Sequence, residues 1–465
     1  MNKFRITLLA AALLLLALPP VFGMLTETQV RERIDTLNAN EQLDVRLESY
    51  DRGWFTSRAL LSVAPPQPAD PSVGETFAAL FSQPMAVAVD FNHGPVSLQD
   101  GFFLGVSELL ARPAAEQPGA AAGDPGRAPI PFEFEAQSTF GGDLHFLAQL
   151  LPFDRDIGTD SVSFSGGSIG GTVTGRRITA RAQAETFQYR TGAAILSVQG
   201  VAASADNELL TRYLMPGTVD VSVQRASVEL GFGAASSPVF DASGIAFSSS
   251  TALDADAGLL DGTVSLGVDR TRVGNDTDIT DAAFEAAAQG LDVPALGALY
   301  AAYAESASTP GDPSPPPDAI EPAIVRLLER EPSASVDPLR FNWNGDAFEA
   351  EVFLEANPAA WPVDLDDRRL WATLVNGTAE LSAAKPLAER LAVQIVKSQL
   401  TARLMEGDSI PFEALDTMAE AQAGLVLTML SAQGLLEDTG SLYRARVVLE
   451  NGLMTINGQP LPFGL

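Results

Sequence analysis

The middle of the chain is a succession of short segments in which apolar and polar residues alternate, and this pattern limits the possible fold more than any other feature. Between Phe132 and Asn275 these segments are separated by Gly, Asp or Asn. Alternation with a period of two is typical of a β-strand with one buried face, and short connections join antiparallel neighbours. The sequence therefore predicts a long antiparallel meander in this region.

Further strands are predicted on both sides of the meander. They form a hairpin at residues 43–50 and 54–63, a strand at Met85–Phe91, a hairpin at Leu339–Glu355 around Asn344-Gly345, and a last hairpin at Tyr443–Glu450 and Leu453–Ile456 around Asn451-Gly452. Asn-Gly is the strongest short-range signal for a two-residue hairpin turn.

Helices are predicted mainly after residue 280. Apolar residues recur at helical spacing, or alanine dominates, in Thr28–Ala39, Thr280–Ala307, Ala319–Arg330, Leu387–Met405 and Ala414–Leu436. The predicted fold class is therefore α+β: a mostly antiparallel, elongated or curved sheet with helices in the C-terminal third.

The first 23 residues, MNKFRITLLAAALLLLALPPVFG, place Lys3 and Arg5 before an apolar stretch from Ile6 to Phe22. This arrangement is typical of an export signal, either an uncleaved anchor helix or a cleaved signal peptide. We expect a single inner-membrane anchor with a periplasmic body, and secretion to the periplasm after cleavage is the alternative. Either form would export the remainder of the chain.

Changes in composition suggest domain boundaries. The predicted regions are a signal segment at 1–23, a β-rich region at 24–111, an Ala/Gly/Pro-rich linker or loop at 112–131, the meander with a helix at 132–307, a Pro-rich linker at 308–318 and an α+β region at 319–465.

Composition excludes several kinds of site and partner. The chain has no cysteine, so disulfides, thiolate metal sites and cysteine nucleophiles are ruled out. Its 59 acidic and 29 basic residues give a net charge of −30, which argues against a nucleic-acid partner because such binding begins with phosphate neutralisation. No phosphate-binding or dinucleotide motif is present, and we expect neither a cofactor nor a bound metal.

Few residues offer catalytic chemistry. Gly166-Gly167-Ser168-Ile169-Gly170 matches G-x-S-x-G but lies between β-patterned runs, and we interpret it as a turn, because a nucleophile elbow joins a strand to a helix. Acidic groups occur at residues 275–281 and 364–367, where solvated turns are the simpler explanation. His93 and His145 are the only imidazoles. We therefore expect that this protein is not an enzyme. The alternative is a periplasmic hydrolase using His93 or an acidic cluster.

Four separated features resemble a known family. The basic-then-apolar N-terminus is followed by Tyr50–Ser57 (YDRGWFTS), then by Asn92–Pro95 (NHGP), and finally by Asn451–Gly458 (NGLMTING). This layout resembles the YdgA family, envelope proteins of largely unassigned function, and it implies an inner-membrane anchor with a periplasmic body. The meander is also loosely similar to AsmA-type envelope proteins, whose curved sheets are associated with lipid handling.

The blocks that carry the resemblance supply candidate binding residues but no catalytic ones. They are Arg52, Gly53, Trp54, Phe55, His93, Gly94, Pro95, Asn457 and Gly458. A structural explanation competes with ligand binding: a tight turn at Arg52-Gly53, a core plug at Trp54-Phe55, and positive φ at Asn457-Gly458. The leading hypothesis is a non-catalytic envelope protein that binds or guides either an apolar ligand, namely a lipid, or a protein partner. A scaffold for cell-surface or motility functions is a further alternative.

Overall fold

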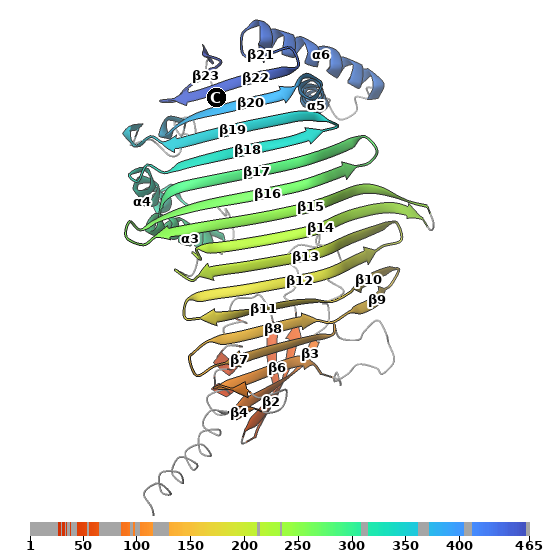
Figure 1. Ribbon diagram of the computed structural model, residues 1–465, viewed down its shortest axis with the longest axis vertical. Coiled ribbons are helices and arrows are strands. Elements are labelled where there is room, and N and C mark those ends of the chain that lie inside the picture. Colours follow the sequence, from red (N-terminus) through yellow and green to blue (C-terminus); the bar gives the residue numbers. More distant parts are fainter. Residues whose placement is uncertain are drawn as a thin grey trace, which may run out of the picture. The chain divides into compact units, whose positions relative to one another are not determined.

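The computed structural model describes residues 27–461, and Figure 1 shows its elements. The exceptions within this span are residues 29, 33, 35–37, 39–43, 54, 65–84, 94–95, 98–102, 115–129, 212–213, 233–234, 308–314, 361–371 and 404–411. The signal segment predicted at 1–23 lies outside the described residues, as do most of the linkers predicted at 112–131 and 308–318. The domain boundaries drawn from them stay predictions.

The chain divides into two compact units. Unit 1 comprises residues 1–207 and 226–238, and unit 2 comprises residues 208–225 and 239–465. No helix within the described ranges combines the length and apolar character needed to cross a bilayer.

Unit 1 is built from antiparallel strands. Their bounds are β1 Asp44–Arg52, β2 Thr56–Ala64, β3 Met85–His93, β4 Val96–Ser97, β5 Phe103–Leu104, β6 Ser107–Pro113, β7 Phe132–Ser138, β8 Leu144–Leu150, β9 Phe153–Ile157, β10 Asp160–Phe164, β11 Gly167–Thr174, β12 Arg177–Arg190 and β13 Ala194–Glu208, whose last residue belongs to unit 2. β14 (Gly217–Phe232) contributes residues to both units. Strands pair in the order β1-β2-β3-β6-β7-β8-β11-β12, so the predicted antiparallel meander is confirmed here.

The core of unit 1 lies on one face of its first strands. Val87, Val89 and Phe91 project there from alternate positions of β3, and Ala59 of β2 and Ala111 of β6 flank Val89 on the neighbouring strands. Val30 packs against this core from a segment in which residues 27, 28, 30–32, 34 and 38 are helical. The helix predicted at Thr28–Ala39 is thus confirmed for the described part of that range.

Unit 2 is also built mainly from antiparallel strands. Their bounds are β15 Ala235–Asp254, β16 Leu259–Val273, β17 Thr277–Asp292, β18 Ser333–Trp343, β19 Asp346–Ala356, β20 Val375–Ala384, β21 Glu437–Asp438, β22 Leu442–Glu450, β23 Leu453–Ile456 and β24 Gln459–Pro460, the first residues of β15 lying in unit 1. The pairing order is β15-β16-β17-β18-β19-β20-β22-β23-β24, and β21 also pairs with β22.

Helices of unit 2 occur in two insertions between strands. They are α3 Val293–Ala307 and α4 Pro317–Leu328 after β17, and α5 Lys385–Arg403 and α6 Phe412–Ala432 after β20, with a 3-10 turn η2 at Pro358–Ala360. Figure 1 shows α3 and α4 beside one end of the sheet and α5 and α6 beside β20 and β22. The predicted helices at 319–330, 387–405 and 414–436 are confirmed within a few residues.

The helix predicted at Thr280–Ala307 is wrong over its first half. Residues 280–292 belong to strand β17, and only Val293–Ala307 is helical. Alanine favours a helix when a segment is considered alone. Here, however, β17 pairs along its length with both β16 and β18, and these two hydrogen-bonded ladders outweigh the local preference.

Asparagine-glycine pairs make the hairpin turns that the sequence predicts. Asn344 and Asn451 have φ values of 53° and 51° and are followed by glycines that also have positive φ. Asn344 also accepts a hydrogen bond from the Asp278 N–H through its side-chain oxygen, at 2.8 Å, and so extends the ladder of the neighbouring strand. This side-chain role explains why asparagine, and not only glycine, suits the position.

Candidate functional site

The structure brings two of the sequence blocks together at one end of unit 1. Thr56 of the first block lies at the start of β2 and pairs with Asn92 of the second block on β3. His93 is the last residue of β3 and pairs in register with Ser107. The side chain of His93, and Trp54, Gly94 and Pro95, lie outside the described residues, so their predicted roles stay predictions.

The turn between β1 and β2 explains Gly53 and corrects the interpretation of Phe55. The Gly53 N–H donates to the Thr56 carbonyl at 2.8 Å, and a Cβ at Gly53 would lie only 2.5 Å from that oxygen. Arg52 lies near Glu27, with 3.8 Å between Nη1 and Oε2. Phe55 is 50% exposed because it follows the turn outside both strands, so it is not part of a core plug.

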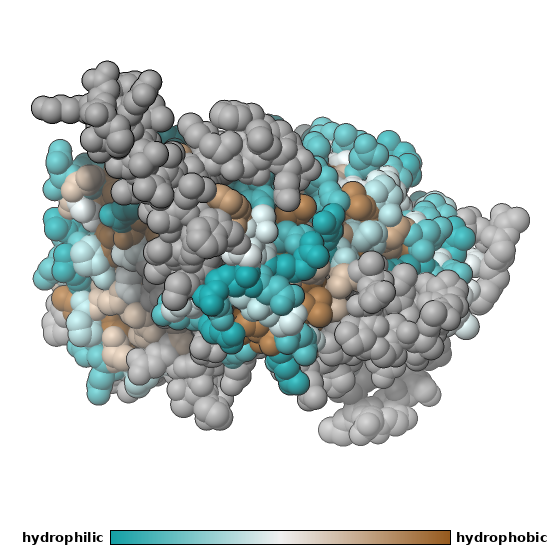
Figure 2. All heavy atoms as spheres, turned by 90° about the horizontal axis from the view of Figure 1, so that it is seen from below, coloured by the Kyte–Doolittle hydropathy of each residue, from teal (hydrophilic) through white to brown (hydrophobic). Residues whose placement is uncertain are grey.

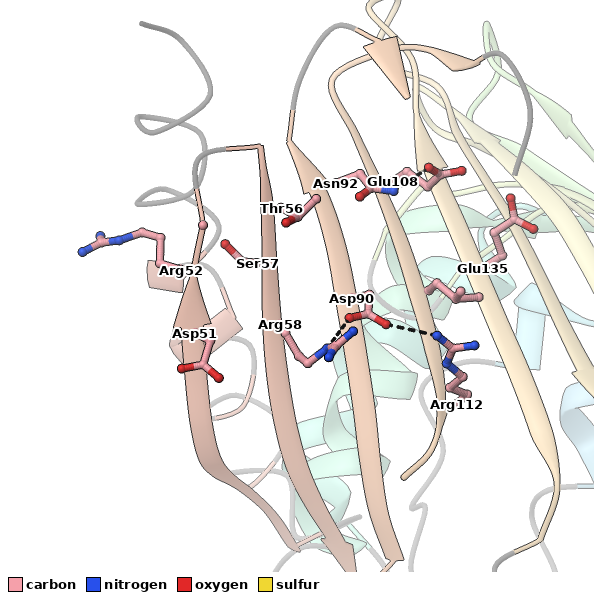
Figure 3. Close-up of a pocket in the computed structure, with 12 residues that line it drawn as sticks. Asp51, Arg52, Thr56, Ser57, Arg58, Asp90, Asn92, Glu108, Arg112 and Glu135 are labelled. Carbon is pink, nitrogen blue, oxygen red and sulfur yellow. Dashed lines mark hydrogen bonds and ion pairs between the residues drawn. The ribbon is translucent and has the colours of Figure 1, made fainter. Parts of the chain in front are cut away.

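A polar pocket of about 800 Å³ opens over the face of β1, β2, β3, β6 and β7 opposite the apolar core (Figure 3). Asp90 projects from β3 into its centre between two arginines. Arg58 Nε lies 2.6 Å from one Asp90 oxygen, and Arg112 Nη2 lies 3.4 Å from the other. Because these side chains come from three adjacent strands, strand register alone places them together.

A buried carboxylate lies in the same pocket. Glu108 is only 6% exposed, and its two oxygens accept hydrogen bonds from Asn92 Nδ2 at 2.9 Å and Gln137 Nε2 at 3.1 Å. Gln137 Nε2 also donates to Glu135 at 2.5 Å. Asn92 therefore donates to a buried polar side chain that would be costly to bury without hydrogen-bond donors. This contact gives the block residue a structural role.

The structure also places other candidates for catalysis that lie within the described residues. Ser168 lies inside strand β11, between β8 and β12, so the G-x-S-x-G match is neither a nucleophile elbow nor the predicted turn. Asp278 pairs with Arg270, and Asp281 accepts from Asn342. No group of three or more potential metal ligands occurs in the part of the chain that the structure describes. The acids at 364–367 fall outside that part.

Asn457 and Gly458 of the terminal block form a turn in unit 2. Asn457 has φ 48° and Gly458 φ 76°, as predicted for this pair. The Asn457 side chain accepts from the Arg446 N–H at 2.8 Å and donates to the Leu435 carbonyl at 3.2 Å. These bonds tie the turn to β22 and to the segment after α6, so the asparagine serves the fold directly.

One face of the unit 2 sheet is apolar from β15 to β22. Side chains in register across these seven strands form three rows: Phe247, Leu266, Phe284, Leu339, Ala350, Leu381 and Ala445; Ser249, Val264, Ala286, Val336, Val352, Ala379 and Val447; and Thr251, Gly262, Ala288, Ala334, Leu354, Gly377 and Leu449. The opposite face carries many polar side chains, among them Ser250, Thr263, Ser265, Glu285, Glu351, Glu380 and Arg446, and its apolar residues include Phe353 and Val448. With strands about 4.8 Å apart, the rows extend about 29 Å.

This apolar face is accessible and carries a groove. Val264, Leu266, Leu354 and Leu381 are between 36% and 43% exposed although all project from central strands of the unit. The groove has a volume of about 350 Å³, and small residues such as Gly262, Ala286, Ala288 and Ala334 line it between larger neighbours. Elsewhere on the molecule, Figure 2 views the surface from below and shows hydrophobic residues among hydrophilic ones. An exposed apolar surface of this kind marks a binding site more often than a chance feature.

Sequence reasoning recognised the strands but missed this face and the Asn92–Glu108 contact. Alternation within β16 already showed which residues share a side, but joining seven strands into rows requires their registers. Glu108 comes from a strand 16 residues away from Asn92, and nothing near it in sequence indicates the contact.

Comparison with known proteins gives one finding. A model of a bacterial protein family of unknown function, DUF945, matches residues 1–463. No curated protein and no solved structure matches the chain. The match confirms that nearly the whole chain follows one bacterial family pattern. The narrower YdgA assignment and the weaker likeness to AsmA-type proteins stay predictions.

Proposed function

The chain belongs to the DUF945 family of bacterial proteins of unknown function, and we propose that it is a non-catalytic envelope protein that binds an apolar ligand. The ligand lies on the apolar face of the unit 2 sheet, and its hydrocarbon part occupies the groove over β15–β19. The observation that carries the proposal is the set of three apolar rows, four of whose large side chains are exposed.

The energetics favour a hydrocarbon occupant. Each methylene group moved from water onto an apolar surface contributes about 0.8 kcal/mol when fully buried. Five such groups would give about 4 kcal/mol, which corresponds to millimolar binding before the costs of association are counted. An occupant with longer chains would add to this through the rest of the face.

The proposal also includes where the protein lies in the cell. The basic residues Lys3 and Arg5 before an apolar stretch support an inner-membrane tether with a periplasmic body, where lipid is the abundant apolar ligand. Fractionation of cells expressing the full chain, together with protease accessibility in spheroplasts, tests this part. Recovery of the full chain from the cytoplasm would contradict it.

Filling the groove tests the binding function. Ala334 is exposed on β18 within the groove, and Ala334→Trp would occupy it without disturbing a buried core. The matched control is Ser250→Trp, because Ser250 is exposed on the opposite face of the same sheet. Isothermal titration of the delipidated protein with dioctanoylglycerol measures the affinity.

We expect the wild-type protein and Ser250→Trp to bind dioctanoylglycerol alike and Ala334→Trp to bind at least tenfold more weakly. A tenfold loss corresponds to about two methylene groups displaced from the groove. Absence of binding to the wild-type protein, or equal binding by both variants, contradicts the proposal.

A further inference from the structure

The apolar face of unit 2 is continued along its strands by arginines. In β16 the alternate residues Val264, Leu266 and Val268 are followed, on the same side, by Arg270 and Arg272. Arg272 pairs in register with Asp241 on β15 and with Asp278 on β17. Hydrophobic and charged side chains therefore succeed one another on a single face.

Three arginines and two aspartates make up this arginine cluster: Arg225, Arg270, Arg272, Asp241 and Asp278. Arg225 Nε lies 2.7 Å from Asp241, and Arg270 holds Asp278 through two contacts of 2.8 and 2.6 Å. The guanidinium of Arg270 lowers the pKa of Asp278, so this carboxylate stays ionised. Counting all five groups, the cluster carries an excess of one positive charge in a chain whose net charge is −30.

Among the three arginines of the arginine cluster, Arg272 has the longest ion-pair distance to a carboxylate. Its Nε lies 3.8 Å from Asp278, whose oxygens already accept from Arg270. The side chains of Arg225, Arg270 and Arg272 are 55%, 43% and 52% exposed, so an incoming ligand can reach them. A guanidinium binds phosphate through two parallel hydrogen bonds, a geometry that an ammonium lacks.

The dimensions suit a lipid that lies along the strands. From Val268 to Gly262 the apolar side of β16 spans six residues, or about 20 Å at about 3.3 Å per residue. One leaflet contributes about half of the roughly 30 Å hydrocarbon core of a bilayer. A membrane lipid with its headgroup at the arginine cluster can thus place its chains on the apolar rows and reach the groove.

We propose that the ligand of this face is an anionic, phosphate-bearing lipid whose headgroup binds Arg225, Arg270 and Arg272. This inference rests on the proposed function, because it adds the headgroup to the apolar ligand already assigned to the face. Charge complementarity selects the lipid: the excess positive charge lies where the apolar rows end, so the site matches an amphiphile with one anionic end.

Three probes separate the contributions of chain and headgroup. Dioctanoyl phosphatidic acid carries both, dioctanoylglycerol carries the chains alone, and inorganic phosphate carries the charge alone. Their affinities for the delipidated full chain are measured by isothermal titration at low and at 0.5 M salt. The variants are Arg272→Gln and, as a matched control, Arg446→Gln, since Arg446 is similarly exposed on the opposite face.

We expect phosphatidic acid to bind at least tenfold more tightly than dioctanoylglycerol at low salt, with the advantage shrinking at high salt. Arg272→Gln should remove about tenfold of the phosphatidic acid affinity, the loss typical of one charge-assisted hydrogen bond, and leave dioctanoylglycerol binding unchanged. Arg446→Gln should leave both unchanged. Far-UV circular dichroism checks that each variant is folded.

Other outcomes overturn the inference. Equal affinities for phosphatidic acid and dioctanoylglycerol would refute the anionic headgroup while leaving the apolar-ligand proposal standing. Binding of neither lipid would refute both proposals. If inorganic phosphate bound as tightly as phosphatidic acid, the lipid chains would not contribute to binding. If Arg272→Gln and Arg446→Gln lost equal affinity, the arginine cluster would not be the headgroup site.

Discussion

Asp292 joins the sheet of unit 2 to its first helix pair, and replacing it tests how that junction is held. It is the last residue of β17 and is 1% exposed. One carboxylate oxygen accepts from the Ala295 N–H at 3.0 Å and from Arg326 Nε at 2.7 Å, and the other lies 3.5 Å from Arg330 Nε. The side chain therefore caps α3 and pairs with two arginines of the α4 region.

The expected loss of unfolding free energy on replacing Asp292 follows from these contacts. Loss of a helix cap costs about 1 kcal/mol. Loss of a hydrogen bond to a charged donor costs about 2 kcal/mol, and the longer contact to a half-exposed arginine adds little. We expect Asp292→Ala to lower the free energy of unfolding of unit 2 by about 3 kcal/mol. Asp292→Asn keeps an acceptor for the cap but not the charge, so its cost should be about half of that.

Urea unfolding followed by far-UV circular dichroism measures these changes, and hydrogen exchange of the α3 amides shows whether the loss is local. Asp256→Ala is the matched control, since Asp256 is an exposed turn acid in the same unit, and its effect should stay below about 0.5 kcal/mol. If Asp292→Ala cost no more than this control, the cap and the ion pairs would not hold the junction.

Three further predictions concern the core, a turn and a titration. Phe91→Ala should destabilise unit 1 by about 3–5 kcal/mol, since Phe91 is buried, whereas Phe55→Ala, at an exposed ring, should change the unfolding free energy by less than about 0.5 kcal/mol. Asn344→Ala should cost about 2 kcal/mol in urea unfolding, because alanine at positive φ is strained and two side-chain hydrogen bonds are lost. Arg270 lowers the pKa of Asp278 below its ordinary 3.8, so this pair stabilises the fold above that pH and loses its contribution as the pH falls through the lowered pKa. Carboxyl NMR should show the titration of Asp278 moving up toward 3.8 in Arg270→Gln, and an unchanged titration would contradict this cause.

Local sequence patterns predicted the structure correctly where the residues concerned favour a single conformation. Asn344-Gly345 and Asn451-Gly452 make the predicted hairpin turns, because both residues of such a turn need positive φ. The α6 region also agrees, since its apolar spacing matches only a helix over more than five turns.

Local signals failed where two structures suit the same residues. Residues 280–292 contain many alanines, which fit either a helix or the small-residue centre of a sheet. Only pairing with β16 and β18 decided between them, and both partners lie outside the segment. Phe55 shows the same limit, because its aromatic ring predicts burial while its place after a turn leaves it half exposed.

The sequence by itself determined that this chain is mostly antiparallel sheet, where most turns lie, and that thiol chemistry is impossible. These features depend on neighbouring residues or on composition alone. Only the tertiary structure decided which side chains share a surface, because register relates strands that are far apart in the sequence. The apolar rows, the arginine cluster beside them and the Glu108 contacts all come from register. The apolar rows carry the proposed function, and the arginine cluster carries the inference about the headgroup.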